Sequence, residues 1–266
     1  MKLDYSFARE LTSLGSEVKP NKLINSRLAV FNYELASQLD LSNEWQNESQ
    51  LFAALYSDQG ALNRHSLAQK YGGHQFGHWN PELGDGRGLL LAEAIDKQQN
   101  RWDLHLKGAG PTPYSRFADG RAVLRSTIRE YLASEALHYL GIPTSRALCL
   151  ITSDEPVYRE KQERAAKMIR VCQSHIRFGH FEYFYHSQQP EKLQNLFDYC
   201  FNYHFADCVQ TDYPYLAMFE KVVKDTAKLI AKWQAFGFNH GVMNTDNMSI
   251  HGITFDYGPY AFLDDF

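Results

Sequence analysis

The sequence predicts an α+β fold, in which an antiparallel sheet carrying one helix is followed by a helical region. Two observations support this prediction. Residues 89–171 read as strand, strand, helix, strand, strand, and from about residue 190 apolar residues recur at helical spacing. The composition is that of a folded globular protein, with 44% hydrophobic and 22% charged residues among 266 and a mean hydropathy of −0.45.

The composition also argues against several classes of protein. The 27 Lys and Arg residues against 31 Asp and Glu residues give a formal net charge of −4, so we expect no nucleic-acid partner bound through bulk charge. No apolar run approaches the roughly 20 residues of a membrane helix, and the start lacks a secretory signal, so we expect no membrane partner. The four dispersed cysteines, without a Cys-x-x-Cys pair, are typical of reduced thiols in a cytoplasmic protein.

The first half of the chain shows strand and helix patterns around a glycine-rich segment. Residues 71–88 contain six of the 17 glycines, a density that usually serves positive φ or a close approach of the backbone to a partner. We expect strands over 28–32, 89–92 and 102–107, helices over 33–39 and 48–58, and a polar hairpin connection over 96–100.

The strongest helix signal spans residues 121–140. Apolar residues step along it at intervals of three and four, and Gly141 and Pro143 follow as a stop signal. Beyond it we expect short strands over 148–152, 157–159 and 168–171, helices over 193–205 and 216–236, a loop over 240–248 and a hairpin over 249–255. The first two of these strands are expected to pair with each other.

Lys107 is the first candidate site residue, at the end of a predicted strand and before Gly108-Ala109-Gly110. Glu130 lies in the predicted helix 23 residues later. In kinase-like folds a strand lysine, ion-paired to a glutamate of the next helix, binds nucleotide phosphates. The alternative interpretation is a solvated lysine at a strand end.

Two further segments could bind phosphate. In Gly84-Asp85-Gly86-Arg87-Gly88, backbone N–H groups could approach phosphate oxygens and Arg87 adds positive charge, whereas a plain turn is the alternative. A third segment, Asp119-Gly120-Arg121, could likewise be a helix N-cap and nothing more. Arg170 and Arg177 are either surface residues or guanidinium groups that converge on a phosphate.

The most specific motif starts at His240 and continues to Asn247, followed by Asp256-Tyr257-Gly258. Kinase catalytic loops read His-x-Asp-x-x-x-x-Asn and are followed by Asp-Phe-Gly, so the spacing and the second motif both match. Asn and Asp oxygens suit Mg²⁺. Val242 stands where a kinase has its catalytic Asp, which leaves Asp246 as the carboxylate that could act as base.

Together these motifs resemble the selenoprotein O (YdiU) family of kinase-like protein adenylyltransferases. The matching runs span nearly the whole chain: 71–78, 84–88, 106–116, 119–121, 174–182 and 240–248. The resemblance implies a protein-kinase-like two-lobed fold with an antiparallel-sheet N-lobe and a helical, truncated C-lobe. Residues 1–70 would be an N-terminal extension, 71–186 the N-lobe with the nucleotide-binding loop, and 187–266 a partial C-lobe with the catalytic and metal-binding loop. Because family members are longer, we expect an N-terminal portion or a shortened member.

The resemblance also implies a reaction and its residues. AMP would pass from ATP to Ser, Thr or Tyr hydroxyls of proteins, and some members use UTP with Mn²⁺. Asp246 would accept the proton, Asn247 and Asp256 would bind Mg²⁺ or Mn²⁺, and Glu130 would pair with Lys107. The residues implied to bind ATP are Gly84, Gly86, Arg87, Lys107, Asp119, Gly120, Arg170, Arg177 and Asp256, with Lys107, Arg170 and Arg177 at the γ-phosphate. A kinase that transfers the γ-phosphate and a catalytically inactive nucleotide-binding pseudokinase are the alternatives.

Overall fold

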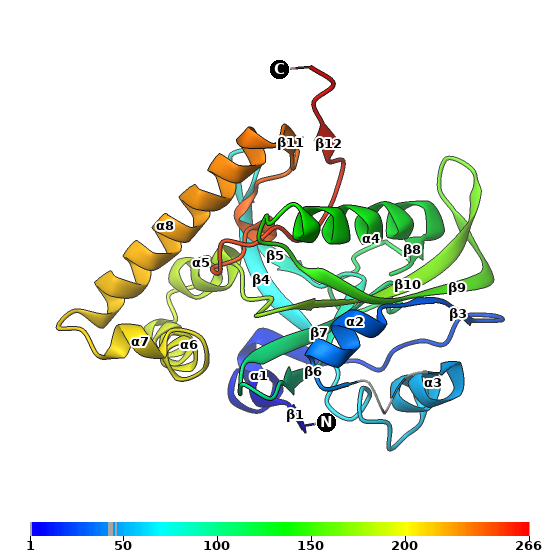
Figure 1. Cartoon of the computed structure of the whole chain (residues 1–266). Helices are drawn as coiled ribbons and strands as arrows, with labels where there is room; N and C mark the ends of the chain where they lie inside the picture. Colours follow the sequence, from blue (N-terminus) through cyan, green and yellow to red (C-terminus); the bar gives the residue numbers. More distant parts are fainter. Residues whose placement is uncertain (1, 42–44, 46, 266) are drawn as a thin grey trace. The chain divides into compact units, whose positions relative to one another are not determined.

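The computed structural model describes residues 2–41, 45 and 47–265 (Figure 1). The predicted α+β class is confirmed, since a large antiparallel sheet is combined with several helices. The chain divides into two compact units. Unit 1 comprises Met1–Lys70, Gly84–Glu135 and Arg146–Gln173, and unit 2 comprises Tyr71–Leu83, Ala136–Ser145 and Ser174–Phe266.

The sheet follows the order β2-β4-β6-β7-β10-β9-β3, with β1 beside β6, β5 beside β4 and β8 beside β10. Its strands are β1 (Lys2–Asp4), β2 (Gly15–Glu17), β3 (Arg27–Phe31), β4 (Leu67–Gln75), β5 (His78–Gly84), β6 (Gly88–Ile95), β7 (Arg101–Lys107), β8 (Ala122–Val123), β9 (Arg146–Tyr158) and β10 (Gln162–Cys172). Neighbours β6, β7, β10 and β9 are antiparallel. Strands from the first 31 residues therefore belong to the same sheet as the later ones.

The central strands separate an apolar face from a polar one. Leu104 and Leu106 of β7 belong to the hydrophobic core, whereas Lys107, next to Leu106, points to the opposite face because side chains alternate along a strand. In the register with β10, Ile169 lies opposite Leu106 and Arg170 lies opposite His105. Residues that lie directly opposite each other share a face, so this register places Arg170 on the polar face with Lys107.

The helices and the second small sheet complete the chain. The helices are α1 (Ser6–Glu10), α2 (Tyr33–Gln38), α3 (Glu48–Tyr56), α4 (Leu124–Tyr139), α5 (Phe178–His186), α6 (Pro190–Tyr203), α7 (Ala206–Val209) and α8 (Pro214–Ala235), with 3-10 turns η1 (Thr12–Leu14) and η2 (Thr245–Asn247). Strands β11 (Phe238–Asn239) and β12 (Ala261–Phe262) pair with each other. Within the described part of the chain, no helix has the length and apolarity needed to cross a bilayer. The four cysteines are buried free thiols, as predicted.

Helix α4 is confirmed, although its buried face differs from its apolar stripe. The helix ends where predicted, since Gly141 adopts φ +73° and the N–H of Ile142 donates to the carbonyl of Leu137 at 2.9 Å. Leu132, a member of the apolar series, is 62% exposed. The polar Glu130 is buried instead. The spacing therefore predicted the helix correctly without indicating the side that packs inward.

Two predicted strand pairings are wrong. Residues 148–152 and 157–159 do not pair with each other but lie in the single strand β9, whose partner β10 is longer than the predicted 168–171. The hairpin over 249–255 does not form, because Ser249 bridges to Arg177 and Thr254 bridges to Thr144. Helix α5 was not predicted.

The glycine-rich segment is mostly strand. Strands β4 and β5 pair with each other, and Phe76 and Gly77 form the two-residue turn between them. Both turn residues have positive φ, +52° and +78°, as two-residue hairpin turns require. Glycine therefore serves a tight turn here, and only the last part of the segment forms the loop before β6.

Candidate functional site

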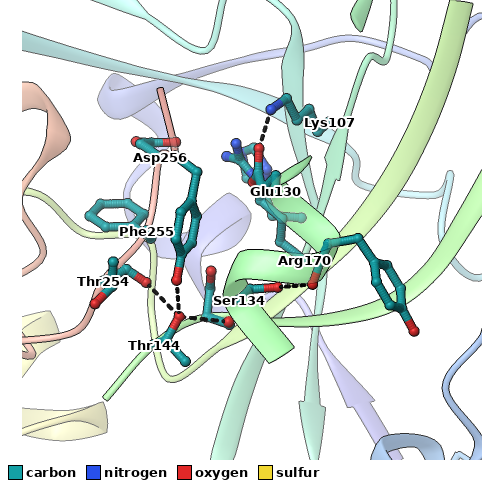
Figure 2. Close-up of polar contacts among 12 residues, drawn as sticks. Lys107, Glu130, Ser134, Thr144, Arg170, Thr254, Phe255 and Asp256 are labelled. Atoms are coloured by element: carbon teal, nitrogen blue, oxygen red, sulfur yellow. Dashed lines mark hydrogen bonds and ion pairs between the residues drawn. The ribbon is translucent and has the colours of Figure 1, made fainter. Parts of the chain in front are cut away.

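The predicted pair of Lys107 and Glu130 is present and includes a third residue. The Lys107 ammonium is ion-paired to Oε2 of Glu130, and Nε of Arg170 is hydrogen-bonded to Oε1 of the same carboxylate (Figure 2). Strand β7 supplies the lysine, α4 the glutamate and β10 the arginine. All three residues are buried: the exposed fraction is 3% for Lys107, 1% for Glu130 and 6% for Arg170. The structure thus brings together three of the predicted residues in unit 1.

Burial and mutual charge set the ionisation of this trio. Burial is the main cause that lowers the pKa of Lys107 from 10.5 to about 8, against the opposing attraction of Glu130. Burial acts to raise the pKa of Glu130, but Arg170 and Lys107 together hold that pKa below its usual value. Glu130 is therefore ionised at neutral pH and binds two cations. It fixes both of them on the polar face of the sheet.

The Gly84–Gly88 loop lies directly beside Lys107. Gly88 is the register partner of Lys107, and the carbonyl of Arg87 accepts hydrogen bonds from the N–H groups of Gly108 and Ala109 at 2.8 and 3.1 Å. Arg87 is exposed and also contributes to lowering the pKa of Lys107. The loop therefore places a further cation near the trio.

The glycines of this loop serve packing rather than an open backbone. A Cβ on Gly84 would lie 2.4 Å from the ring of Tyr114, and one on Gly86 would lie 2.9 Å from its carbonyl oxygen. The N–H groups of Asp85 and Gly86 donate within the chain, to Gln69 and Gly84. Two of the backbone N–H groups that the sequence suggested for phosphate binding are thus already used in hydrogen bonds within the chain.

Asp85 anchors the loop, a role that no local pattern predicted. Its Oδ2 accepts the N–H of Gln69 at 3.1 Å and lies 3.0 Å from Nε2 of His105, in the strand that ends at Lys107. Thr112 donates to the carbonyl of Asp85 at 2.8 Å. These contacts fix the loop to β4, to β7 and to the segment after Gly110.

Asp119 and Gly120 lie in the loop before β8. Arg159 donates two hydrogen bonds of 2.9 Å to the Asp119 carboxylate. These bonds are the main cause that lowers the pKa of Asp119. Gly120 has φ +65°, and a Cβ there would lie 2.1 Å from the backbone of Gly110. Because α4 begins only at Leu124, Asp119 is not its N-cap.

Asp246 of turn η2, the predicted base, is a buried carboxylate of unit 2. It is 7% exposed, and its Oδ2 accepts a hydrogen bond of 2.9 Å from Nε2 of Gln75. Its Oδ1 has no hydrogen-bond partner among the described residues. Burial raises the pKa of Asp246, with Gln75 opposing the rise. Both features favour a base over a merely structural carboxylate.

The β4–β5 hairpin holds the loop that contains Asp246, a role that the sequence did not reveal. The N–H of His74 donates to Oγ1 of Thr245 at 3.0 Å, and both side chains bind Glu182 of α5, His74 through Nδ1 at 3.0 Å. Gly73 leaves room for the carboxylate, since a Cβ there would lie 2.7 Å from Oδ1 of Asp246. The runs 71–78 and 174–182 contained these residues, but no local pattern assigns them a function.

Arg177 is paired with Asp256 in unit 2. Its Nε and Nη2 donate to Oδ2 of Asp256 at 3.0 and 2.8 Å, and its guanidinium lies 4.4 Å from the ring centre of Tyr71 and 5.0 Å from that of Phe255. Only 1% of Arg177 is exposed. Arg177 thus contacts a predicted metal ligand, and Arg170 contacts the Glu130 carboxylate.

The chemistry of Asn247 and Asp256 suits a hard cation. Asn247 is half-buried next to Asp246, and the strand-like segment after it bridges through Ser249 to Arg177, which pairs with Asp256. In the part of the chain that the structure describes, no three His, Cys, Asp or Glu side chains gather as a metal site. Mg²⁺ commonly binds through one or two protein oxygens plus substrate phosphates, so this small donor set fits a metal that is shared with a nucleotide.

Known proteins resemble the chain over its whole length. Residues 1–266 match the family model described as protein adenylyltransferase SelO. A protein nucleotidyltransferase YdiU of Pseudoalteromonas atlantica is 68% identical over 266 residues, which are 100% of this chain and 55% of that relative. One of Pseudomonas aeruginosa is 57% identical over 264 residues, which are 99% of this chain and 54% of that relative. The chain therefore spans about half the length of the curated relatives that it matches.

Proposed function

Because the chain belongs to the SelO family of protein adenylyltransferases, we propose that it takes part in the transfer of AMP from ATP to hydroxyl groups of proteins. The observation that carries the proposal is the buried trio, in which Lys107 and Arg170 share the Glu130 carboxylate beside the Gly84–Gly88 loop. Cations fixed in this way attract the negative charge of a triphosphate. A strand lysine paired with a helix glutamate also supports a kinase-like arrangement of this sheet and helix.

The cations act on the leaving group. In the proposed reaction Lys107, Arg170 and Arg177 bind the β- and γ-phosphates, and Arg87 with Asp119 contacts the remainder of the nucleotide. Charge builds on the β-phosphate as pyrophosphate leaves, so cations fixed in advance stabilise the transition state more than the ground state. Glu130 keeps Lys107 from moving away from the phosphates.

The acceptor is a Ser, Thr or Tyr hydroxyl of a protein. Its oxygen forms a bond to the α-phosphorus, and the bond from that phosphorus to the oxygen bridging to the β-phosphorus breaks. The electron pair of the broken bond leaves with pyrophosphate, and the hydroxyl proton passes to Asp246. The unpartnered Oδ1 and the raised pKa of Asp246 support this role.

Asn247 and Asp256 are the residues that would hold Mg²⁺ or Mn²⁺. When bound, the ion would neutralise phosphate charge. UTP with Mn²⁺ is the second nucleotide and metal pair that we propose, and the sequence resemblance supports it. Transfer of the γ-phosphate is disfavoured because Val242 occupies the position of the kinase base and can neither accept a proton nor orient a hydroxyl.

Labelled nucleotides test the proposal. The purified chain is incubated with Mg²⁺ and either α-³²P-ATP or γ-³²P-ATP, with the chain itself and casein as acceptors. The Pseudomonas aeruginosa relative is the positive control, and the Lys107→Met variant is the negative control. We expect protein label from α-³²P-ATP alone. Label from the γ-position would favour the kinase alternative, and ATP binding without transfer, while the relative is active, would favour the inactive nucleotide-binding alternative.

A further inference from the structure

Asp256 has a backbone conformation that needs support from its surroundings. Its φ is +53°, in the left-handed region that residues other than glycine adopt at a cost in free energy. Such a conformation persists where neighbouring contacts determine it, and it is frequent at functional sites. The contacts on either side of Asp256 therefore show what holds this proposed metal ligand in place.

The segment before Asp256 is anchored to the connection between α4 and β9. Thr254 forms a parallel bridge with Thr144, its carbonyl accepts the N–H of Ser145 at 2.8 Å, and its N–H donates to the carbonyl of Pro143 at 2.9 Å. Its hydroxyl accepts a hydrogen bond from Trp233 at 2.8 Å. The chain is thus fixed two residues ahead of Asp256.

The residue after Asp256 is anchored to the same connection through its side chain. The hydroxyl of Tyr257 is hydrogen-bonded to Oγ1 of Thr144. Oγ1 of Thr144 also lies 3.0 Å from the carbonyl of Ser145 and 3.2 Å from that of Thr254; Thr144 and Thr254 are labelled in Figure 2. Thr144 has a single hydroxyl proton and lies near two carbonyls that can only accept, so its contacts are all satisfied when Tyr257 donates to Thr144 and Thr144 donates to a carbonyl. Tyr257 is buried, with 6% exposed, which protects this bond from water.

We propose that Tyr257 and Thr144 form a hydroxyl latch, a pair of positioning residues that holds Asp256 in its left-handed conformation and thereby strengthens binding of the metal–nucleotide pair. The inference rests on the proposed function for the metal role of Asp256. Phenylalanine at this position would fill the same space and keep the ring contacts with Phe238 and His240, but it would lose the hydrogen bond to Thr144. The latch thus assigns a function to the one oxygen atom that distinguishes Tyr257 from the Phe of the kinase motif.

Three variants isolate this oxygen. Tyr257→Phe removes the hydrogen bond between the two hydroxyls alone. Thr144→Val removes it together with the bond of Thr144 to a carbonyl, and the double variant should lose no more than Thr144→Val. Tyr158→Phe is the matched control, because Tyr158 is 71% exposed at the end of β9 and no hydrogen bond of its hydroxyl is found among the described residues. Hydrogen–deuterium exchange of residues 254–258 is measured without nucleotide. Binding of Mn²⁺ in the presence of a non-hydrolysable ATP analogue is measured by electron paramagnetic resonance.

We expect faster exchange at residues 256–258 and about 3- to 10-fold weaker Mn²⁺ binding in each single variant. The double variant should equal Thr144→Val, because Tyr257→Phe acts on a bond that Thr144→Val has already removed. Unchanged exchange in Tyr257→Phe overturns the latch whether or not the chain binds nucleotide. Faster exchange with unchanged Mn²⁺ binding overturns its role at the metal. Absence of Mn²⁺ and analogue binding in the parent chain, with a latch visible by exchange, instead refutes the metal role and with it the proposed function.

Discussion

Replacing Glu130 with Gln should destabilise the chain far more than replacing its partner Lys107 with Met. Glu130→Gln keeps the shape of the side chain but removes the one charge that Lys107 and Arg170 share. Lys107→Met leaves the bond between Arg170 and Glu130 in place and removes an ammonium whose charged form burial already disfavours. The order of the two effects follows from the position of Glu130 between two cations.

The magnitude follows from burial. Removing one partner of a buried ion pair costs about 3–5 kcal/mol, and 1 kcal/mol lowers the melting temperature by about 2–4 °C in a protein of 150–250 residues. Glu130→Gln should therefore lower the melting temperature by about 6–20 °C, and Lys107→Met by clearly less. Thermal unfolding followed by circular dichroism at pH 7 measures both.

A matched control separates burial from the mere loss of a carboxylate. Glu220 of α8 pairs with Lys224 at 3.3 Å, and both side chains are exposed, so Glu220→Gln should change the melting temperature little. The reasoning is refuted if Glu130→Gln is no more destabilising than Lys107→Met, or if it equals the Glu220→Gln control.

Three further predictions concern single charges. Burial lowers the pKa of Lys167 from 10.5 to about 7, so between about pH 7 and 10 the unfolded chain binds a proton that the folded chain has released. The free energy of unfolding should therefore rise with pH by up to about 1.4 kcal/mol per pH unit. Urea unfolding at pH 7, 8 and 9 should show this rise in the parent chain but not in Lys167→Met, and the same pH dependence in both would contradict the lowered pKa. Asp246→Asn should keep ATP binding in calorimetry but reduce AMP transfer by about 100-fold or more, and unimpaired transfer would exclude Asp246 as the base. Asp256→Asn should weaken Mn²⁺–nucleotide binding and also lower the melting temperature, because the buried Arg177 loses its ion pair with Asp256. An unchanged melting temperature would argue against the ion pair.

Local sequence patterns predicted the longer helices and the central strands but not the face that a helix buries. The apolar spacing identified α4, yet Leu132 is exposed and Glu130 is buried. A glutamate is rarely buried without a compensating charge, and its two partners come from strands 23 residues before it and 40 residues after it. The prediction of the Lys107–Glu130 pair came from a motif, and Arg170 joined it only through the strand register.

Long-range contacts explain the remaining failures. In place of the predicted hairpin over 249–255, Ser249 and Thr254 form bridges to Arg177 and Thr144, which lie far away in the sequence. Gln75 donates to Asp246 across 171 residues. Period and turn signals act over a few residues, so they identify the segment that contains Asp246 but not the hairpin residues that orient its carboxylate.

The pairing of Arg177 with Asp256 predicts that metal and nucleotide bind cooperatively. The proposed phosphate contact and the proposed metal ligand neutralise each other in a buried environment. A metal ion at Asp256 alone would weaken that ion pair and add a second positive charge beside Arg177, and a phosphate at Arg177 alone would place two anions side by side. Metal and triphosphate together supply both missing charges at once, so each ligand should raise the affinity of the other. The small set of protein oxygens points the same way, because a bound nucleotide would supply the further oxygen ligands that the proposed metal needs.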